Sequence, residues 1–399
     1  MKILIVGGTG GVGRDVARLL AAQPLISALV IAGRDDAAVA AVAVDIGPCA
    51  TGARVDVHDD GRLMTLAAGV DLLVDVSGPD LDTPLPVATA AVRAGVDLLD
   101  IGADGSMTAR VLALDGAARA AGVTGLIGMG VAPGVTNLLA LHAARQLDEA
   151  RAIRVGYVWD DPGLRQAGDT ARAMRASGRV NASWQTILSF TRGPVCAYRR
   201  GAPVLLPPFA EAHSFVLPEG VPVTAYPVDS AELRMLPSHL PGVADITSEV
   251  ALFPAPLAAL WRAQAARIGR GEVGTAAATI AFHEAVAADP DRWLASDTPA
   301  PTTPQWAVAE GIKDGRPARY TCWPRPWWLD TAAVVTTAAL AMLRGDVPGP
   351  GFFPPEARFA PLPFIAAVAD SAGGGGGGGG GGALLDESLE YLDDGGAAR

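Results

Sequence analysis

The fold of this chain is decided near its start, where the apolar run Lys2-Ile3-Leu4-Ile5-Val6 is followed by the turn Gly8-Thr9-Gly10-Gly11-Val12-Gly13. The apolar run predicts a buried strand, and the amphipathic stretch after the turn predicts a helix. A G-x-G-x-x-G turn between a strand and a helix indicates a dinucleotide site. Gly8 would allow the tight turn, Gly10 would let the backbone approach a pyrophosphate, and Gly13 would permit close helix–strand packing. The helix N-terminus would face the pyrophosphate.

Short apolar runs alternate with amphipathic stretches through the first 145 residues, which is typical of repeated βα units. We expect strands at 2–6, 28–32, 54–57, 71–76, 97–101 and 124–128, and helices at 11–22, 36–44, 62–68, 86–94 and 111–121. The strands read as continuous apolar runs, as parallel strands covered on both faces do. The sequence therefore predicts an α/β fold of Rossmann type with a doubly wound parallel sheet.

From about Arg151 the character of the sequence changes. Period-two stretches such as 153–159 alternate with loops rich in proline and glycine, and all eight tryptophans lie in this later part. This pattern predicts a second, α+β domain with a mainly antiparallel sheet. Ten consecutive glycines, 373–382, then lead into an acidic segment. Because polyglycine cannot pack a core, 371–399 are expected to be a disordered linker and solvated tail. A partner-binding amphipathic turn at 385–392 is the alternative.

The composition of the chain limits the classes of molecule that we expect it to bind. The net charge of −11 and the pI of about 4.9 argue against nucleic acid, which requires a basic face. No window offers the roughly 18 apolar residues of a membrane helix. The opening strand is too short for the apolar region of a signal peptide, so we expect a cytoplasmic protein. The expected partner is a small-molecule substrate. The three cysteines and five histidines show no metal-ligand spacing, and no metal site is expected.

The end of the second strand bears on which dinucleotide binds, and it reads Ile31-Ala32-Gly33-Arg34-Asp35. An acidic residue directly at the strand end would hold the ribose 2′-hydroxyl of NAD. Gly33 and Arg34 instead leave room for a 2′-phosphate paired with a guanidinium, which favours NADP over NAD. In the alternative, Arg34 is an exposed turn residue and Asp35 binds the hydroxyl.

Two further strand ends carry site candidates, because ligands of open α/β folds bind at the carboxyl edge of the sheet. Ser77-Gly78-Pro79 closes one strand, where a loop commonly lies against the nicotinamide ribose. Asp100-Ile101-Gly102 closes the next strand. Gly102 is grouped with the cofactor site, and Asp100 is a candidate catalytic carboxylate that could instead cap a loop.

In the order of its motifs the chain resembles the saccharopine dehydrogenase-like oxidoreductases. The matching segments are the glycine turn with Gly33-Arg34, 74–79, 91–100, 118–137, Tyr226-Pro227 with Leu236-Pro237, 310–315, the helix from Thr331, and Pro354-Pro355-Glu356. The resemblance implies a discontinuous nucleotide-binding domain of 1–135 and 330–370, a substrate and dimerisation domain of 136–329, and a cleft between them.

The resemblance also implies hydride transfer between NADP(H) and a carbon–nitrogen centre, as imine reduction or amine oxidation of an amino-acid-like or specialised metabolite. One alternative is a reductase of an activated C=C or C=O bond. Another is a non-catalytic NADP-binding scaffold. A homodimer is expected from the apolar second-domain sheet and its tryptophans.

Polar and aromatic residues beyond the first domain provide the remaining candidates. Asp100, Ser183 and Tyr320 are the catalytic candidates. The substrate candidates are Asn137, Asn181, Ser183, Trp184, Arg175 and Trp328, with Arg172, Gln185, His213 and Lys313 as further polar groups. An N-cap is the alternative role for Asn181 and Ser183. A β-turn is the simplest role for Lys313.

Overall fold

In the computed structural model the chain divides into two compact units. The structure describes residues 1–302, 305–324, 330–371 and 384–392. The first unit comprises Met1–Leu138 and Trp328–Gly382, and the second comprises Leu139–Trp327 and Ala383–Arg399. The boundary falls within helix α7 (Val135–Arg145).

The first unit contains a parallel sheet of seven strands within the described ranges, in the order β15-β6-β5-β4-β1-β2-β3. Its strands are β1 (Lys2–Val6), β2 (Ala28–Gly33), β3 (Ala50–Arg54), β4 (Leu72–Asp75), β5 (Asp97–Asp100), β6 (Thr124–Leu126) and β15 (Gly351–Phe353). Its helices are α1 (Gly11–Ala21), α2 (Asp36–Ile46), α3 (Asp60–Ala67), α4 (Pro84–Ala94), α5 (Gly105–Leu112), α6 (Asp115–Ala121), α14 (Thr331–Arg344), η3 (Pro355–Ala357) and α15 (Pro361–Ser371). The predicted α/β class and doubly wound parallel sheet are confirmed.

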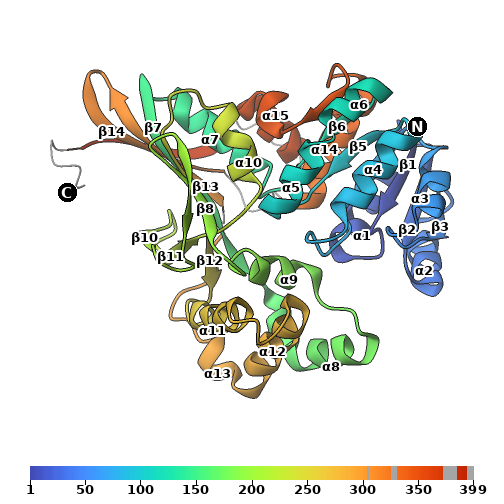
Figure 1. Cartoon of the computed structure of the whole chain (residues 1–399), viewed down its shortest axis with the longest axis horizontal. Coiled ribbons are helices and arrows are strands. Elements are labelled where there is room, and N and C mark those ends of the chain that lie inside the picture. Colours follow the sequence, from blue (N-terminus) through green and yellow to red (C-terminus); the bar gives the residue numbers. More distant parts are fainter. Residues whose placement is uncertain (303–304, 325–329, 372–383, 393–399) are drawn as a thin grey trace. The chain divides into compact units, whose positions relative to one another are not determined.

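Both faces of this sheet are covered, as the continuous apolar strands require. Ile3, Leu4, Ile5 and Val6 of the central strand β1 are each at most 1% exposed. Leu4 and Val6 belong to a core with residues of α3 and α4, while α1 packs on α14 (Figure 1). Because strand side chains alternate between faces, no polar position is left in β1 after Lys2.

Two sequence predictions for this unit are wrong in position. The third strand is Ala50–Arg54 and not 54–57. Its small residues do not form the apolar run that is typical of a strand. They are small because α2 crosses here: a Cβ on Gly52 would lie 2.9 Å from the carbonyl carbon of Val39. The helix expected at 111–121 is two helices, α5 and α6, and the first of them begins at the cap Asp104.

The second unit is built on a mixed sheet of nine strands among the described residues. Seven form the order β10-β11-β12-β7-β13-β14-β16, while β8 pairs with β12 and β9 pairs with β8. The strands are β7 (Glu149–Asp160), β8 (Val195–Arg199), β9 (Ala202–Leu206), β10 (His213–Val216), β11 (Pro222–Pro227), β12 (Asp245–Phe253), β13 (Gln305–Lys313), β14 (Arg316–Pro324) and β16 (Leu385–Tyr391). The pairing is antiparallel except between β12 and β7.

A helical cluster accompanies this sheet. Its longer helices, α8 (Ala167–Ser177), α9 (Ala182–Ser189), α11 (Leu257–Gly269) and α12 (Thr275–Ala288), pack on one another (Figure 1). The short elements are η1 (Pro162–Gln166), α10 (Glu232–Met235), η2 (Leu236–Ser238) and α13 (Pro290–Trp293). No helix in the described part of the chain is both long and apolar enough to span a bilayer.

The acidic segment after the glycine run is not a solvated tail over 385–391. It forms β16, which pairs antiparallel with β14 from Ala318↔Tyr391 to Pro324↔Leu385. Leu385 is buried, whereas Leu389 and Tyr391 are exposed. The strand therefore extends the second sheet, and the prediction of disorder is corrected for these residues. The polyglycine run itself lies outside the described residues.

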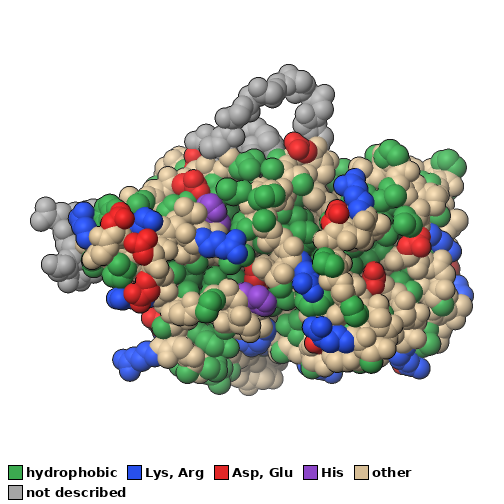
Figure 2. Space-filling model, turned by 90° about the horizontal axis from the view of Figure 1, so that it is seen from above, with side chains coloured by type: hydrophobic (Ala, Val, Ile, Leu, Met, Phe, Trp, Pro, Cys, Tyr) green, Lys and Arg blue, Asp and Glu red, His purple; other side chains and the backbone are tan. Residues whose placement is uncertain are grey.

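Charged side chains of both signs are interspersed on the face drawn in Figure 2, and neither sign gathers into one large patch. The described residues contain no group of three His, Cys, Asp or Glu side chains arranged to hold a metal ion.

Candidate functional site

The turn between β1 and α1 is held by the strands on either side of it. The N–H groups of Gly7 and Gly8 both donate to the carbonyl of Ala32 at 3.1 Å. Gly7 has a φ of +85°, and a Cβ on it would lie 2.6 Å from the backbone of Ser77. Gly7, directly before the predicted motif, is therefore the residue of this turn that takes the left-handed conformation. A strand-end glycine directly before the motif is the signal that was overlooked.

Gly13 is the glycine at which helix and turn meet most closely. A Cβ there would lie 2.4 Å from the carbonyl oxygen of Gly7 and 2.7 Å from the Cα of Gly8. By contrast, a Cβ on the exposed Gly11 would meet nothing within 4 Å. Gly10 is the N-cap of α1 and provides no side-chain cap, so the first turn of the helix is open to an external anion.

The strand ends beside this turn carry basic side chains. Arg34 is exposed, and no ion pair of Arg34 occurs within the described ranges. The carboxylate of Asp35 caps α2 by accepting from the N–H of Ala38 at 3.1 Å. Arg54, at the end of β3, donates from Nε to the carbonyl of Arg34 at 3.3 Å, and the same nitrogen lies 3.8 Å from Oδ2 of Asp36. Arg54 is a second cation beside Arg34, and its position was not predicted because the small residues of β3 form no apolar run.

Two buried carboxylates lie side by side behind the turn. Asp75 and Asp100 are register partners on β4 and β5 and are 2% and 3% exposed. Burial raises the pKa of Asp75 to about 6. Burial, together with the negative charges of Asp75 and Asp80, raises the pKa of Asp100 well above its usual range. Near neutral pH the pair therefore resists carrying two negative charges.

Both carboxylates hold the loops that follow their strands. Ser77 donates to Oδ1 of Asp75 from its backbone N at 2.9 Å and from its hydroxyl at 2.6 Å. Oδ1 of Asp100 accepts from the N–H of Gly102 at 3.1 Å and of Gly128 at 3.4 Å. The loop-capping alternative for Asp100 is thus the one seen, and Asp100 is a positioning residue for the loop that contains Gly102.

These features fit a nicotinamide dinucleotide. Residues 3–126 match the family model described as the saccharopine dehydrogenase NADP binding domain. The first domain belongs to the saccharopine dehydrogenase-like family. The predicted resemblance is confirmed, and with it the class of NAD(P)-dependent oxidoreductases. A search of curated protein sequences finds no match to the chain.

Two solved structures show the same fold over nearly the whole chain. Saccharopine dehydrogenase (L-Glu forming) from Saccharomyces cerevisiae is 15% identical, with 98% of this chain and 99% of that chain covered at a TM-score of 0.63. The homospermidine synthase of Legionella pneumophila, determined in complex with NAD, is 14% identical, with 98% and 91% covered at a TM-score of 0.58. At these identities the likeness shows the fold alone.

In the saccharopine dehydrogenase-like domain, Asn137 does not present a free amide. It is fully buried, and its Oδ1 accepts from the N–H of Gly134 at 3.0 Å. Its Nδ2 donates to Oε2 of Glu356 at 3.0 Å. Asn137 therefore joins the turn after β6 to the Pro-Pro-Glu segment, which corrects its assignment as a substrate contact.

Most second-unit candidates also have structural partners. Asn181 caps α9 by accepting from the N–H of Trp184 at 3.1 Å. The indole of Trp184 is fully buried, donates to Asp161 at 2.6 Å and stacks on Phe282, so Trp184 is a core residue and not a substrate contact. Ser183 is exposed and stays a candidate.

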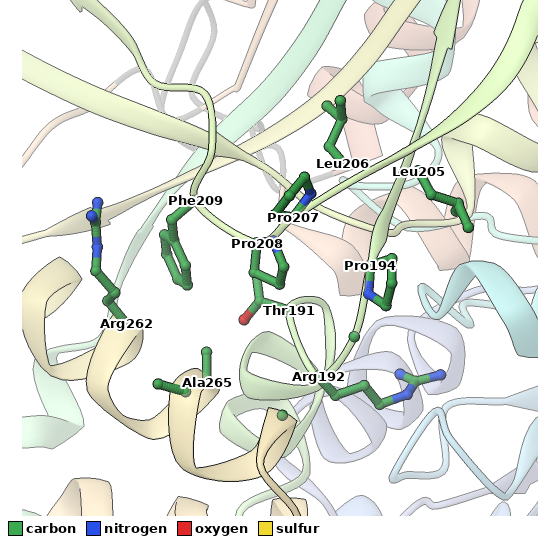
Figure 3. Close-up of a pocket in the computed structure, with 13 residues that line it drawn as sticks. Thr191, Arg192, Pro194, Leu205, Leu206, Pro207, Pro208, Phe209, Arg262 and Ala265 are labelled. Carbon is green, nitrogen blue, oxygen red and sulfur yellow. The ribbon is translucent and has the colours of Figure 1, made fainter.

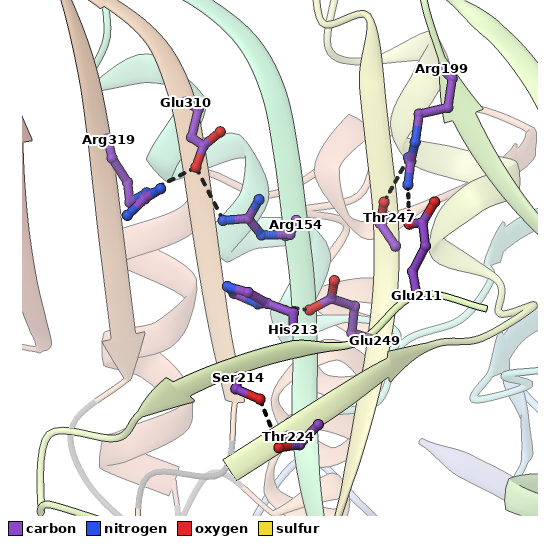
Figure 4. Close-up of polar contacts among 10 residues, drawn as sticks. All are labelled: Arg154, Arg199, Glu211, His213, Ser214, Thr224, Thr247, Glu249, Glu310 and Arg319. Carbon is purple, nitrogen blue, oxygen red and sulfur yellow. Dashed lines mark hydrogen bonds and ion pairs between the residues drawn. The ribbon is translucent and has the colours of Figure 1, made fainter. Parts of the chain in front are cut away.

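The remaining polar candidates take part in ion pairs or buried contacts. Arg175 forms a two-bond ion pair with Glu284. Arg172 pairs with Asp169, Lys313 with Asp148, and Gln185 donates to Thr275. His213 contacts Glu249 (Figure 4). Trp328 lies outside the described residues.

Tyr320 of β14 forms a hydrogen bond to the C-terminal strand β16. Its hydroxyl donates to Oε1 of Glu387 on β16 and lies 3.3 Å from Nε2 of His142. Burial and the carboxylate of Glu387 raise the pKa of Tyr320 far above its ordinary value. A phenol that is held protonated and already donates to a carboxylate favours a structural role for Tyr320 over that of a catalytic acid.

Proposed function

We propose that this chain is an NADP-dependent oxidoreductase that transfers a hydride to or from a carbon–nitrogen centre of an amino-acid-like or specialised metabolite. The observation that carries the preference for NADP is the corner formed by Arg34 and Arg54. Two guanidinium groups there offer charge-assisted hydrogen bonds to a 2′-phosphate. Asp35, which would hold the 2′-hydroxyl of NAD, is engaged in capping α2.

The glycine turn supports the rest of the cofactor assignment. The cofactor supplies the hydride, and the chain supplies binding and orientation. Gly10, Gly11 and Val12, at the open N-terminus of α1, would hold the pyrophosphate, with Gly8, Thr9 and Gly13 shaping the turn. Ser77-Gly78-Pro79 and Gly102 would lie near the nicotinamide ribose. Asp75 and Asp100 act behind them by fixing these two loops.

The test of the cofactor preference compares two dinucleotides on three proteins. NADPH and NADH are titrated into the wild type, Arg34→Ala and Arg54→Ala, and binding is followed by cofactor fluorescence. Loss of one guanidinium–phosphate contact is expected to weaken the binding of NADPH about tenfold or more and to leave the affinity for NADH within about threefold of the wild-type value. Tighter binding of NADH than of NADPH by the wild type would show that the assignment of Arg34 is wrong.

The test of the reaction type is turnover. Consumption of NADPH is measured with a panel of amine-plus-carbonyl pairs, with the same carbonyl compounds alone, and with activated alkenes. Oxidation of NADPH that requires both amine and carbonyl supports imine reduction. Turnover of a carbonyl compound or alkene alone points to the C=O or C=C alternative. Binding of NADPH without turnover of any compound would contradict the proposed reaction and favour a non-catalytic binding role.

A further inference from the structure

A pocket of about 550 Å³ opens within the second unit (Figure 3). Three segments line it: the turn after α9, the end of β9 with the loop that follows, and α11. This volume lies within the range of about 300–1,000 Å³ that is usual for small-molecule sites. The pocket shares no residue with the dinucleotide site, so its occupant can be tested separately from the proposed function.

A buried polar atom without a partner lies at the wall of this pocket, whose lining is mostly apolar. Thr191 is 1% exposed, and its hydroxyl oxygen has no hydrogen-bond partner. Figure 3 shows this oxygen directed into the space between Pro208 and Ala265. A buried hydroxyl that is left unpaired is unfavourable, whereas one that meets a ligand atom contributes to specificity.

The wall beside Thr191 is aromatic and held in a strained conformation. Phe209 has a φ of +60°, which is rare for a bulky residue. Its ring lies edge-on to Trp261 at 4.9 Å and to Tyr226 at 5.2 Å between centroids. The surrounding rings therefore fix Phe209 where it borders the pocket. A non-glycine residue in this conformation is typical of sites that clamp a ligand.

A cation lies at the edge of the same wall. The guanidinium carbon of Arg262 is 5.0 Å from the centroid of Phe209 and 5.3 Å from that of Tyr226. Arg262 is exposed, and no ion pair of Arg262 occurs in the part of the chain that the structure describes. In a chain with a net charge of −11, an arginine without a carboxylate partner that lines a pocket favours an anionic ligand.

We propose that this pocket binds a small aryl-alkyl carboxylic acid that carries a second polar group at the far end of its apolar body. The carboxylate pairs with Arg262, and the apolar body lies against Phe209 and the two prolines Pro207 and Pro208. The second polar group, such as a phenolic hydroxyl, hydrogen-bonds to Thr191. The pocket is thus a second ligand site of the protein.

The experiment uses the full-length chain and isothermal titration calorimetry with three probes. These are 4-(4-hydroxyphenyl)butanoate, its primary amide, and 4-phenylbutanoate, so that the charge and the hydroxyl are removed one at a time. The variants are Arg262→Gln and Thr191→Val. The matched control is Arg270→Gln, which removes the same charge from the end of the same helix but does not line the pocket.

The expected result is saturable one-to-one binding of the hydroxylated acid to the wild type and the control. Arg262→Gln should weaken the binding of the acid about tenfold or more and leave the affinity for the amide unchanged, because an ionic hydrogen bond is lost. Thr191→Val should weaken the hydroxylated acid about fivefold and leave 4-phenylbutanoate unchanged. Unchanged unfolding midpoints show that each variant is folded.

Three outcomes would overturn the proposal. One is the absence of binding of any probe at millimolar concentration. Another is binding of the acid to Arg262→Gln as tightly as to the wild type. The third is a self-associated state in sedimentation velocity that Arg262→Gln dissociates, because the pocket would then be covered by a second copy of the chain.

Discussion

Replacement of Gly13 by alanine tests the dinucleotide site through its tightest contact. The added Cβ would lie 2.4 Å from the carbonyl oxygen of Gly7, whereas ordinary contact begins near 3.4 Å. Helix α1 and the turn would have to separate by the difference, 3.4 − 2.4, or about 1 Å. Overpacking of this kind costs about 1–3 kcal/mol, and loss of a glycine within a helix returns about 0.5–1 kcal/mol. The expected net destabilisation is about 1–2 kcal/mol.

The same displacement should lower the affinity for the cofactor more than it lowers the stability of the fold. The N–H groups of α1 that would face the pyrophosphate move with the helix, and loss of one or two ionic hydrogen bonds lowers affinity about 10- to 100-fold. Binding is measured by NADPH fluorescence on titration, and stability by denaturant unfolding. Gly116→Ala, in α6 and outside the glycine turn, is the matched control, since its Cβ would meet nothing within 4 Å. It should bind NADPH within about threefold of the wild type and unfold with equal or slightly higher stability.

One result would refute this reasoning. If Gly13→Ala binds NADPH and unfolds like the wild type, the turn does not hold the cofactor as proposed.

Three further predictions concern buried polar groups. Burial raises the pKa of Asp75 from 3.8 to about 6, so its contribution to stability is complete below pH 4 and is lost as the pH rises through 6. Asp75→Asn should therefore abolish this pH-dependent decrease, which is about 2–3 kcal/mol in the free energy of unfolding between pH 4 and pH 7.5; an unchanged pH profile would contradict it. Tyr320→Phe should destabilise the protein by about 1–2 kcal/mol and increase amide hydrogen exchange in β16, whereas the exposed Tyr391→Phe should not; equal exchange in both would count against the tail contact. Asn137→Ala leaves the carboxylate of Glu356 without one of its donors and should cost about 3 kcal/mol by denaturant unfolding, with a cost under about 1 kcal/mol as the contrary result.

Sequence reasoning was most accurate where one local pattern decided the structure. The continuous apolar run of β1, the amphipathic period of α1 and the cap of α14 are each visible in the residues themselves. It was least accurate at β3, where small residues serve a neighbouring helix and leave no apolar run. Its substrate candidates were chosen by residue type, and side chains such as Trp184 have the same type whether they line a site or a core.

By itself, the sequence determined the doubly wound domain and the glycine turn, because strand and helix periods and the needs of glycine are local properties. Only the tertiary structure decided that Gly7 rather than Gly8 takes the left-handed conformation, since the backbone of Ser77, 70 positions further along the chain, fills the space beside it. The pairing of Asp75 with Asp100 depends likewise on the register of two strands. Residues 385–391 form a strand because β14 offers an edge with which they pair. That edge belongs to another strand, so the residues of the acidic segment, which have little apolar surface, do not reveal it.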